Sequence, residues 1–270
     1  MSGVPDWLAR ARADADRPPA RERLPLHIDG VVCGSVEPAL GDRLVDAKQP
    51  LRRDGRGWHI EGEADASLAA VASWLRSAGL AGAWRDELLV VETGPGRVDA
   101  AIERAAVRPL GITTFAVHLV GATRDSRVWV QRRAFDKAID PGLLDTLMGG
   151  QVAAGETAAT ALERETMEEA GLAIDDLDDV RATGRVTVRR PVDEGYMVEH
   201  IDVFIATVPD GNEPRNLDGE VAGFECLDLA ALEGALANGE FTLEATLILG
   251  AWLEGRAGAS SQAIAVGDNA

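Results

Sequence analysis

The chain has 270 residues, 46% of them apolar, which is enough to bury one large core or two small ones. Its formal net charge of -18 makes it a poor non-specific binder of nucleic acid and of anionic membrane, but a bound metal could still admit a small phosphorylated substrate. We see no signal-peptide pattern and no run of the roughly 20 apolar residues that spans a bilayer, so we expect a cytoplasmic protein.

The first 109 residues predict a small α+β unit. Asp29-Gly30 and Asp54-Gly55 are typical of hairpin turns between short apolar runs. Gly79 follows an apolar stripe and is placed to end a helix. The expected elements are a short helical face at Trp7, hairpins over 26–34 and 51–61, a helix over 67–79, a strand over 87–92 and a helix over 97–108. This unit carries no motif that performs chemistry.

Residues 110–257 predict a second unit with alternating strands and helices. Strands are expected over 112–120, 128–132, 183–190, 200–208 and 224–227, and helices over 157–170, 229–237 and 243–253. This order suits an α/β/α sandwich around a mixed sheet, so the whole chain is expected to be of the α+β class. Residues 258–270 are small and polar and are expected to form a disordered tail.

Three carboxylates of the helix expected over 157–170 lie on one face. Glu165, Glu168 and Glu169 stand at positions i, i+3 and i+4, where like charges repel and weaken a helix. A hard divalent cation such as Mg²⁺ or Mn²⁺ is a natural partner for such oxygen ligands, and would also bridge substrate phosphates and lower the pKa of an attacking water. We therefore predict a metal site on this helix face.

The residues before this helix predict how it is held. Gly149 and Gly150 permit a close backbone approach and positive φ angles in the turn that leads to the helix. Glu156 and Arg164 are eight residues apart across the junction of loop and helix. We expect them to form an ion pair that ties the loop to the helix and leaves the other glutamates free for metal.

The spacing from Gly150 to Leu172 is a recognisable pattern: five residues, Glu156, seven residues, Arg164-Glu165, two residues, Glu168-Glu169, one residue, Gly171-Leu172. It resembles the Nudix box, the signature of Mg²⁺-dependent hydrolases of diphosphates linked to another moiety. Only Thr166 departs, because an aliphatic residue or alanine is usual there. The resemblance implies an α/β/α sandwich and attack of a metal-activated water on one phosphorus of a P–O–P linkage.

The same resemblance implies an additional acid that serves the metals as ligand or general base. Glu220, in a loop before the last expected strand, is our candidate, with Glu199 and Asp202 as weaker ones. A base must come within hydrogen-bond reach of the water that it deprotonates. Arg132, Arg133 and Lys137 follow a strand and are expected to hold phosphate or the leaving group.

The flanks of the box resemble a narrower group, the two-domain Nudix proteins similar to the Nudix-containing portion of fungal thiamine pyrophosphokinases. The segments that carry this resemblance are Gly111-Ile112-Thr113, Val117-His118-Leu119-Val120-Gly121, Gln131-Arg132-Arg133 with Lys137, and Pro141-Gly142-Leu143-Leu144-Asp145. It implies a substrate such as thiamine diphosphate or a damaged analogue of it. The N-terminal unit would restrict the substrate pocket or build a homodimer interface.

Three alternatives stay open at this point. The substrate could be another group linked to a nucleoside diphosphate, such as a sugar or a second nucleotide. The chain could be a catalytically silent ligand sensor, although a sensor has no need to keep a repelling set of acids. It could also be a metal-dependent isomerase on the same scaffold, but that family is expected to use a catalytic cysteine near the box, and the only cysteines here are Cys33 and Cys226, both expected as free thiols.

Overall fold

The computed structural model describes residues 4–94, 97, 100–137, 139–217 and 219–266, with side chains described up to Arg256. Its N-terminal part contains a four-stranded sheet in the order β2-β1-β4-β3 and a two-stranded sheet, β5-β6. The elements are β1 Leu24–Ile28, β2 Val31–Val36, α2 Pro38–Asp46, β3 Leu51–Asp54, β4 Gly57–Ile60, α3 Ala64–Ser77, β5 Leu88–Val91 and β6 Ala100–Glu103. Both expected hairpins are present, and α2 was not expected.

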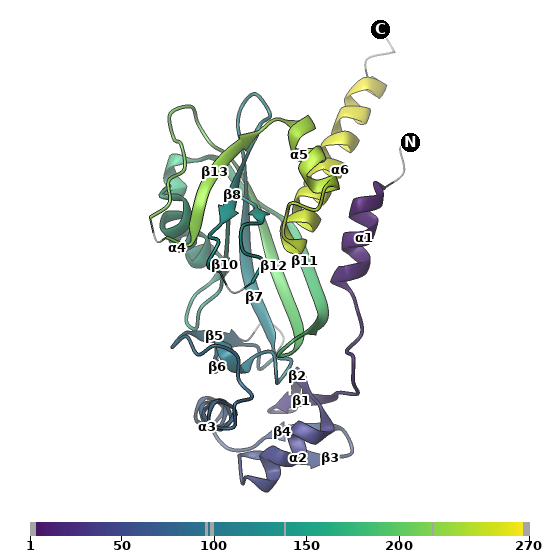
Figure 1. Ribbon diagram of the computed structural model, residues 1–270, viewed down its shortest axis with the longest axis vertical. Coiled ribbons are helices and arrows are strands. Elements are labelled where there is room, and N and C mark those ends of the chain that lie inside the picture. The colour runs from purple at the N-terminus through teal and green to yellow at the C-terminus, as the bar shows by residue number, and fades with distance from the viewer. Residues whose placement is uncertain (1–3, 95–96, 98–99, 138, 218, 267–270) are drawn as a thin grey trace.

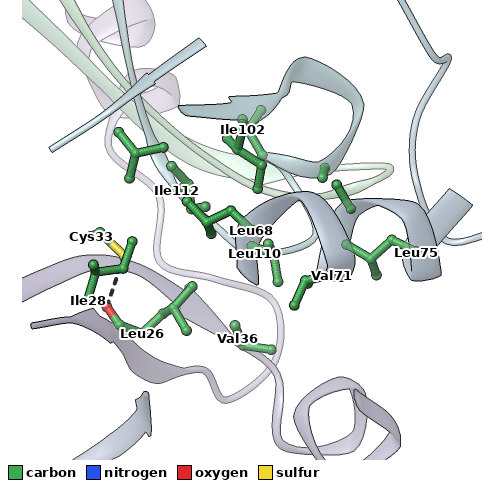
Figure 2. Close-up of a cluster of buried hydrophobic side chains, with 14 of the residues drawn as sticks. Leu26, Ile28, Cys33, Val36, Leu68, Val71, Leu75, Ile102, Leu110 and Ile112 are labelled. Carbon is green, nitrogen blue, oxygen red and sulfur yellow. Dashed lines mark hydrogen bonds between the residues drawn. The ribbon is translucent and has the colours of Figure 1, made fainter. Parts of the chain in front are cut away.

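Local chemistry explains most of these elements. Asp29 and Gly30 have φ angles of 50° and 84°, the left-handed pair that a tight hairpin turn requires. The apolar stripe of α3 packs on β1, β2 and the chain around Leu110, which together form a core of aliphatic side chains (Figure 2). This core is separate from the two clusters of buried apolar residues in the C-terminal part.

One N-terminal expectation was wrong. Residues 97–108 were expected to form a helix, but they contain β6 and a single 3-10 turn, Arg104–Ala106. Ala100 and Ile102 are both buried, and β6 pairs antiparallel with β5, Leu89 opposite Ile102. Over so short a run, burial at alternate positions and burial on one helical turn give similar patterns, so the strand partner decides.

The C-terminal part is built on a mixed sheet with the strand order β11-β12-β7-β8-β13. β7 and β12 run parallel over ten residue pairs, whereas the other neighbours are antiparallel. Two short strands branch from this path: β9 pairs with β8, and β10 pairs with β7. The strands are β7 Thr113–Ala122, β8 Val128–Arg133, β9 Leu144–Asp145, β10 Met148–Gln151, β11 Asp178–Val192, β12 Gly195–Thr207 and β13 Val221–Leu227.

Helices cover both faces of this sheet, as expected for an α/β/α sandwich. α4, Ala158–Ala170, packs on one face through Ala161 and Leu162. α5, Leu229–Ala237, and α6, Leu243–Val266, pack on the other face (Figure 1). The helix α6 continues to Val266, over residues for which a disordered tail was expected. Residues 267–270 lie outside the described part of the chain.

The first helix, α1 Asp6–Ala15, packs beside α6 and not in the N-terminal core (Figure 1). Ala11 and Ala15 belong to the C-terminal core cluster, and the chain then crosses to begin β1. Leu8 is 1% exposed and fits against Gly250, where a Cβ would approach its Cδ1 within 2.6 Å. The first and last helices therefore lie side by side on one face of the C-terminal sheet.

The β5-β6 sheet joins the N-terminal part to the loop before α4. Ala154 N donates a 2.8 Å hydrogen bond to Leu88 O, and Leu89 forms a β-bridge with Ala153. The side chain of Val90 packs in the same core cluster as Leu162 of α4. The described helices include none that is long and apolar enough to cross a membrane.

Candidate active site

The helix α4 begins and ends on specific local signals. Thr157 caps its start: the Thr157 hydroxyl accepts from Thr160 N, and the Thr160 hydroxyl accepts from Thr157 N. Gly171 has a φ of 62°, a left-handed conformation that suits glycine, and it ends the helix. Between them Thr166 is fully buried, and its hydroxyl donates to Leu162 O at 2.6 Å. The unusual residue of the box is thus accommodated within the helix.

The three acids of α4 differ greatly in exposure. Glu169 is 6% exposed, the Glu165 side chain is 15% exposed and the Glu168 side chain is 50% exposed. The helix face that carries them therefore passes from the protein interior to solvent. Burying a charged carboxylate is costly without a partner, so the inner two acids need compensation that the outer one does not.

Glu169 is compensated by hydrogen bonds from the sheet. Its Oε2 accepts from Gln131 Nε2 at 2.9 Å and from Gly149 N at 3.1 Å. Even so, burial raises the pKa of Glu169 to about 8, and the nearby charge of Glu165 contributes to that rise. A divalent cation would reverse this preference, because it favours the charged carboxylate.

Arg164 neutralises much of the rest of this face. Its guanidinium binds Glu156 through two contacts of 2.6 and 2.8 Å, as expected, and reaches Gln151 O at 3.2 Å. It also contacts Glu165 at 2.8 Å and Glu168 at 3.0 Å, which the expectation of free glutamates missed. Burial still raises the pKa of Glu165, against the lowering effect of Arg164.

The two glycines before the helix are required for space. Both lie in β10, and neither has the positive φ angle that was expected. A Cβ on Gly150 would stand 2.0 Å from Cδ of Glu165, and a Cβ on Gly149 would stand 2.4 Å from the His118 ring. The missing side chains thus let the acid-bearing face of α4 approach the sheet.

Glu220 lies close enough to this face for its charge to raise the pKa of Glu165. It directly precedes β13, and Ala134 N donates to its backbone oxygen at 3.0 Å. Its side chain forms an ion pair with Lys137. Burial would raise the pKa of Glu220, but the hydrogen bond and charge of Lys137, followed by the charges of Arg104 and Arg85, lower it below the ordinary value.

The other expected acids and cations have different surroundings. Arg132 pairs with Glu225 at 2.6 Å, and Arg133 lies 3.5 Å from the buried Asp145. Glu199 is buried and accepts hydrogen bonds from Arg108, Thr114 and Gln151, and Asp202 pairs with Arg185. Of the expected basic residues, Lys137 contacts an acid of the proposed metal set, Glu220.

These residues fit a divalent cation by their chemistry. The described residues contain no group of three carboxylate, histidine or cysteine side chains already gathered around one point. The fit rests instead on the buried Glu169 and the partly buried Glu165, whose pKa values are raised, because such groups gain most from an added positive charge. Glu165 and Glu169 would hold the ion with the exposed Glu168, and the glycines of β10 let Glu165 lie against the sheet.

Two site residues were missed by the sequence reasoning. Gln131 holds Glu169, and its buried Oε1 has no partner among the described residues. Asp145 lies 4% exposed where β9 meets β8, and its charge contributes to the raised pKa of Glu169. Both residues lie in segments that carry the narrower resemblance. Their spacing from the box does not predict that they come close to Glu169.

The family model of the NUDIX domain matches residues 112–246, which is half of the chain. The chain belongs to the NUDIX family. The matched segment begins at the start of β7 and ends in α6, so it contains the mixed sheet, α4 and Glu220. It excludes the N-terminal sheets and α1, although α1 packs within the C-terminal core.

Known relatives extend the likeness beyond this domain. Nudix hydrolase 20, chloroplastic, from Arabidopsis thaliana is 28% identical over 65% of this chain and 48% of its own length. Nudix hydrolase 24, chloroplastic, from the same plant is 27% identical over 82% of this chain and 64% of its own length. The isopentenyl-diphosphate Delta-isomerase of Rhodobacter capsulatus is 34% identical over 51% of this chain and 74% of its own length. The chain thus spans about half to two thirds of the plant relatives.

Proposed function

We propose that this protein is a divalent-cation-dependent hydrolase of a diphosphate (P–O–P) linkage. The observation that carries the proposal is the acid set of α4, in which the buried Glu169 and the partly buried Glu165, both with raised pKa values, lie beside the solvent-facing Glu168. Membership of the NUDIX family and the names of the plant relatives support it. When bound, Mg²⁺ or Mn²⁺ would supply charge neutralisation to the diphosphate and activation to the attacking water.

The chain's own residues would share the work as follows. Glu165, Glu168 and Glu169 hold the cation, while Glu156 and Arg164 tie the loop before the helix to the helix itself. Glu220, or one of the acids of α4, takes the proton of the attacking water. Lys137 stands beside Glu220 and binds substrate phosphate, with Arg132 and Arg133 as further candidates.

We propose one substrate class first and keep one alternative. The first candidate is thiamine diphosphate or an analogue of it, which rests on the resemblance of the box flanks. The alternative is a nucleoside diphosphate linked to a sugar or a second nucleotide. We also propose that residues 110–257 are the catalytic unit and that residues 1–109 are its accessory unit. We further propose a cytoplasmic location and a homodimer.

An isomerase is a second candidate, because the bacterial isomerase is 34% identical to this chain over 51% of it. The cysteines argue against it. Cys33 is buried in β2, far from the box in sequence, and burial raises the pKa of its thiol to about 12, which disfavours the reactive thiolate. Cys226 lies in β13, and burial raises its pKa as well. Adding isopentenyl diphosphate to the substrate panel tests this alternative directly.

The decisive measurement is product formation from a panel of diphosphates in the presence of Mg²⁺, followed by chromatography so that free phosphate, phosphomonoesters and isomerised substrate are all detected, with wild type and Glu168→Gln. We expect the variant to lose at least ~10²-fold in turnover, because it removes a carboxylate that supports the cation that stabilises developing charge. Glu163→Gln is the matched control, since Glu163 is exposed on the same helix. Wild-type turnover in folded Glu168→Gln would contradict the assignment, and no turnover of any diphosphate would favour a ligand sensor.

A further inference from the structure

The loop that leads into β5 is fixed to the end of β6. Gly82 N donates to Ala105 O at 2.9 Å, and Arg104 N donates to Glu87 O at 2.9 Å. Arg85 N donates to Oε1 of the buried Glu103 at 3.1 Å. Residues 82–87 and Arg104 therefore form one braced end of the β5-β6 sheet.

This end of the β5-β6 sheet faces the box. Leu88, whose oxygen accepts from Ala154 N, is the first residue of β5 and pairs with Glu103, the last residue of β6. Arg85 lies three residues before Leu88, and Arg104 directly follows Glu103. Both arginines therefore stand at the end of the β5-β6 sheet that lies beside the loop leading into α4. Both arginines lie close enough to Glu220 for their charges to act on it, although Lys137 acts more strongly.

The two arginines differ in the exposure of their side chains and in the contacts of their guanidinium groups. Arg104 Nη1 donates to Glu87 Oε2 at 2.8 Å, which orients the guanidinium while leaving its side chain 39% exposed. Arg85 is exposed, and within the described part of the chain its guanidinium has no hydrogen-bond or ion-pair partner. A braced loop thus holds an exposed cation next to an oriented one.

The charge balance of the site gives these cations a role. Four acids, Glu165, Glu168, Glu169 and Glu220, belong to the proposed site, and a diphosphate adds further negative charge. A cation on α4 neutralises only the phosphate beside it, so the other phosphate needs a positive partner on the opposite side. We propose that Arg85 and Arg104 of the N-terminal region bind the phosphate group of the substrate that lies away from α4.

This inference rests on the proposed function and deepens it, because it makes the N-terminal region part of the substrate site. The bland alternative is that both arginines only offset the charge of Glu220. The alternatives differ in how a lysine substitution acts: lysine keeps the charge that offsets Glu220, so a pure charge offset predicts wild-type affinity for phosphate in the lysine variants, whereas a direct contact also needs the guanidinium donors and predicts a partial loss.

The test measures inorganic pyrophosphate binding in the presence of Mg²⁺ by calorimetry, using the full chain. Arg85→Gln and Arg104→Gln are each expected to weaken binding by about 3- to 10-fold, and the lysine variants are expected to keep part of the affinity. Arg56→Gln is the matched control, because Arg56 is exposed in the turn between β3 and β4. If Arg104→Gln unfolds through the loss of Glu87, the exposed Arg85 still decides the question.

The outcomes separate this inference from the proposed function. If the wild type hydrolyses no diphosphate but both variants still weaken pyrophosphate binding, the inference stands and the hydrolase proposal falls. If hydrolysis is found and both variants bind pyrophosphate as the wild type does, the inference is overturned. A wild type that does not bind pyrophosphate at all also overturns it. With a turned-over substrate, we expect KM to rise while kcat changes little.

Discussion

Glu169 is the innermost acid of α4, and its environment favours the protonated carboxyl. Two hydrogen bonds from Gln131 and Gly149 favour the charged form, but burial outweighs them. The same residue is thus a poor anion in isolation and a good ligand beside a cation. This explains how a repelling set of acids is tolerated by the fold: one member is neutral, and another is held by Arg164.

The raised pKa of Glu169 has a consequence for stability. An unfolded glutamate loses its proton near its ordinary pKa of 4.5, whereas folded Glu169 keeps its proton up to about 8. Between these values the folded chain binds more protons than the unfolded chain, so its free energy of unfolding falls as pH rises. His118 and His200 do not interfere above neutral pH, because burial lowers their pKa values.

We therefore expect the Tm of chelator-treated protein to fall by about 2–4 °C between about pH 7 and about pH 8. Glu169→Gln should show a flatter dependence, because glutamine does not titrate. Scanning calorimetry of both proteins at the two pH values measures the difference. Equal slopes for the two proteins would mean that Glu169 does not hold its proton in the fold.

At the scale of elements, the contact between β10 and α4 positions the acids. Gly150 lies in β10, and a Cβ there would overlap the Glu165 carboxyl at 2.0 Å from Cδ. The atoms in the way are the end of the Glu165 side chain, so a methyl group on residue 150 would push this carboxyl out of its position. The site geometry thus depends on a strand of four residues and on the ion pair of Glu156 and Arg164.

Gly150→Ala tests this dependence. We expect it to destabilise the fold by about 1–3 kcal/mol and to weaken Mn²⁺ binding by about tenfold, because the added methyl displaces Glu165. Gly223→Ala is the control, since Gly223 lies in β13 with open space around it and no positive φ. Denaturant unfolding and Mn²⁺ titration measure the two effects; unchanged Mn²⁺ binding would show that the strand does not set the position of Glu165.

At the scale of the whole molecule, the chain passes twice between its C-terminal and N-terminal parts. α1 joins the C-terminal core, the following residues build the N-terminal sheets, and β5 then returns to pair with the loop before α4. The N-terminal region is therefore connected to the C-terminal part both at a core and at a loop. Truncation at residue 110 would remove α1 as well as the N-terminal sheets, and would expose apolar surface of the C-terminal core.

The docking of α1 is expected to matter for stability and not for the site. Leu8→Ala should destabilise the fold by about 2–5 kcal/mol, because Leu8 is 1% exposed and packs against Gly250. Arg10→Ala, on the exposed face of the same helix, is the control. Thermal unfolding measures the effect. A Leu8→Ala protein as stable as the control would contradict the packing of α1 on α6.

Much of the fold could be predicted because its signals are local. The turn at Asp29-Gly30, the helix cap at Gly171 and the three acids at helical spacing all depend on neighbours in the chain. The NUDIX family and its fold, expected from the box, are confirmed by the family match over residues 112–246. The roles of the individual site residues stay predictions.

Other features depended on contacts between distant segments. The sequence by itself determined the spacing of Glu165, Glu168 and Glu169, because a helix fixes which residues share a face. Only the tertiary structure decided that Glu169 is buried against Gln131, that residues 100–103 pair as a strand, and that Arg85 stands near Glu220. Burial, strand pairing and charge proximity are set by which segments meet in space, and no local pattern encodes that meeting.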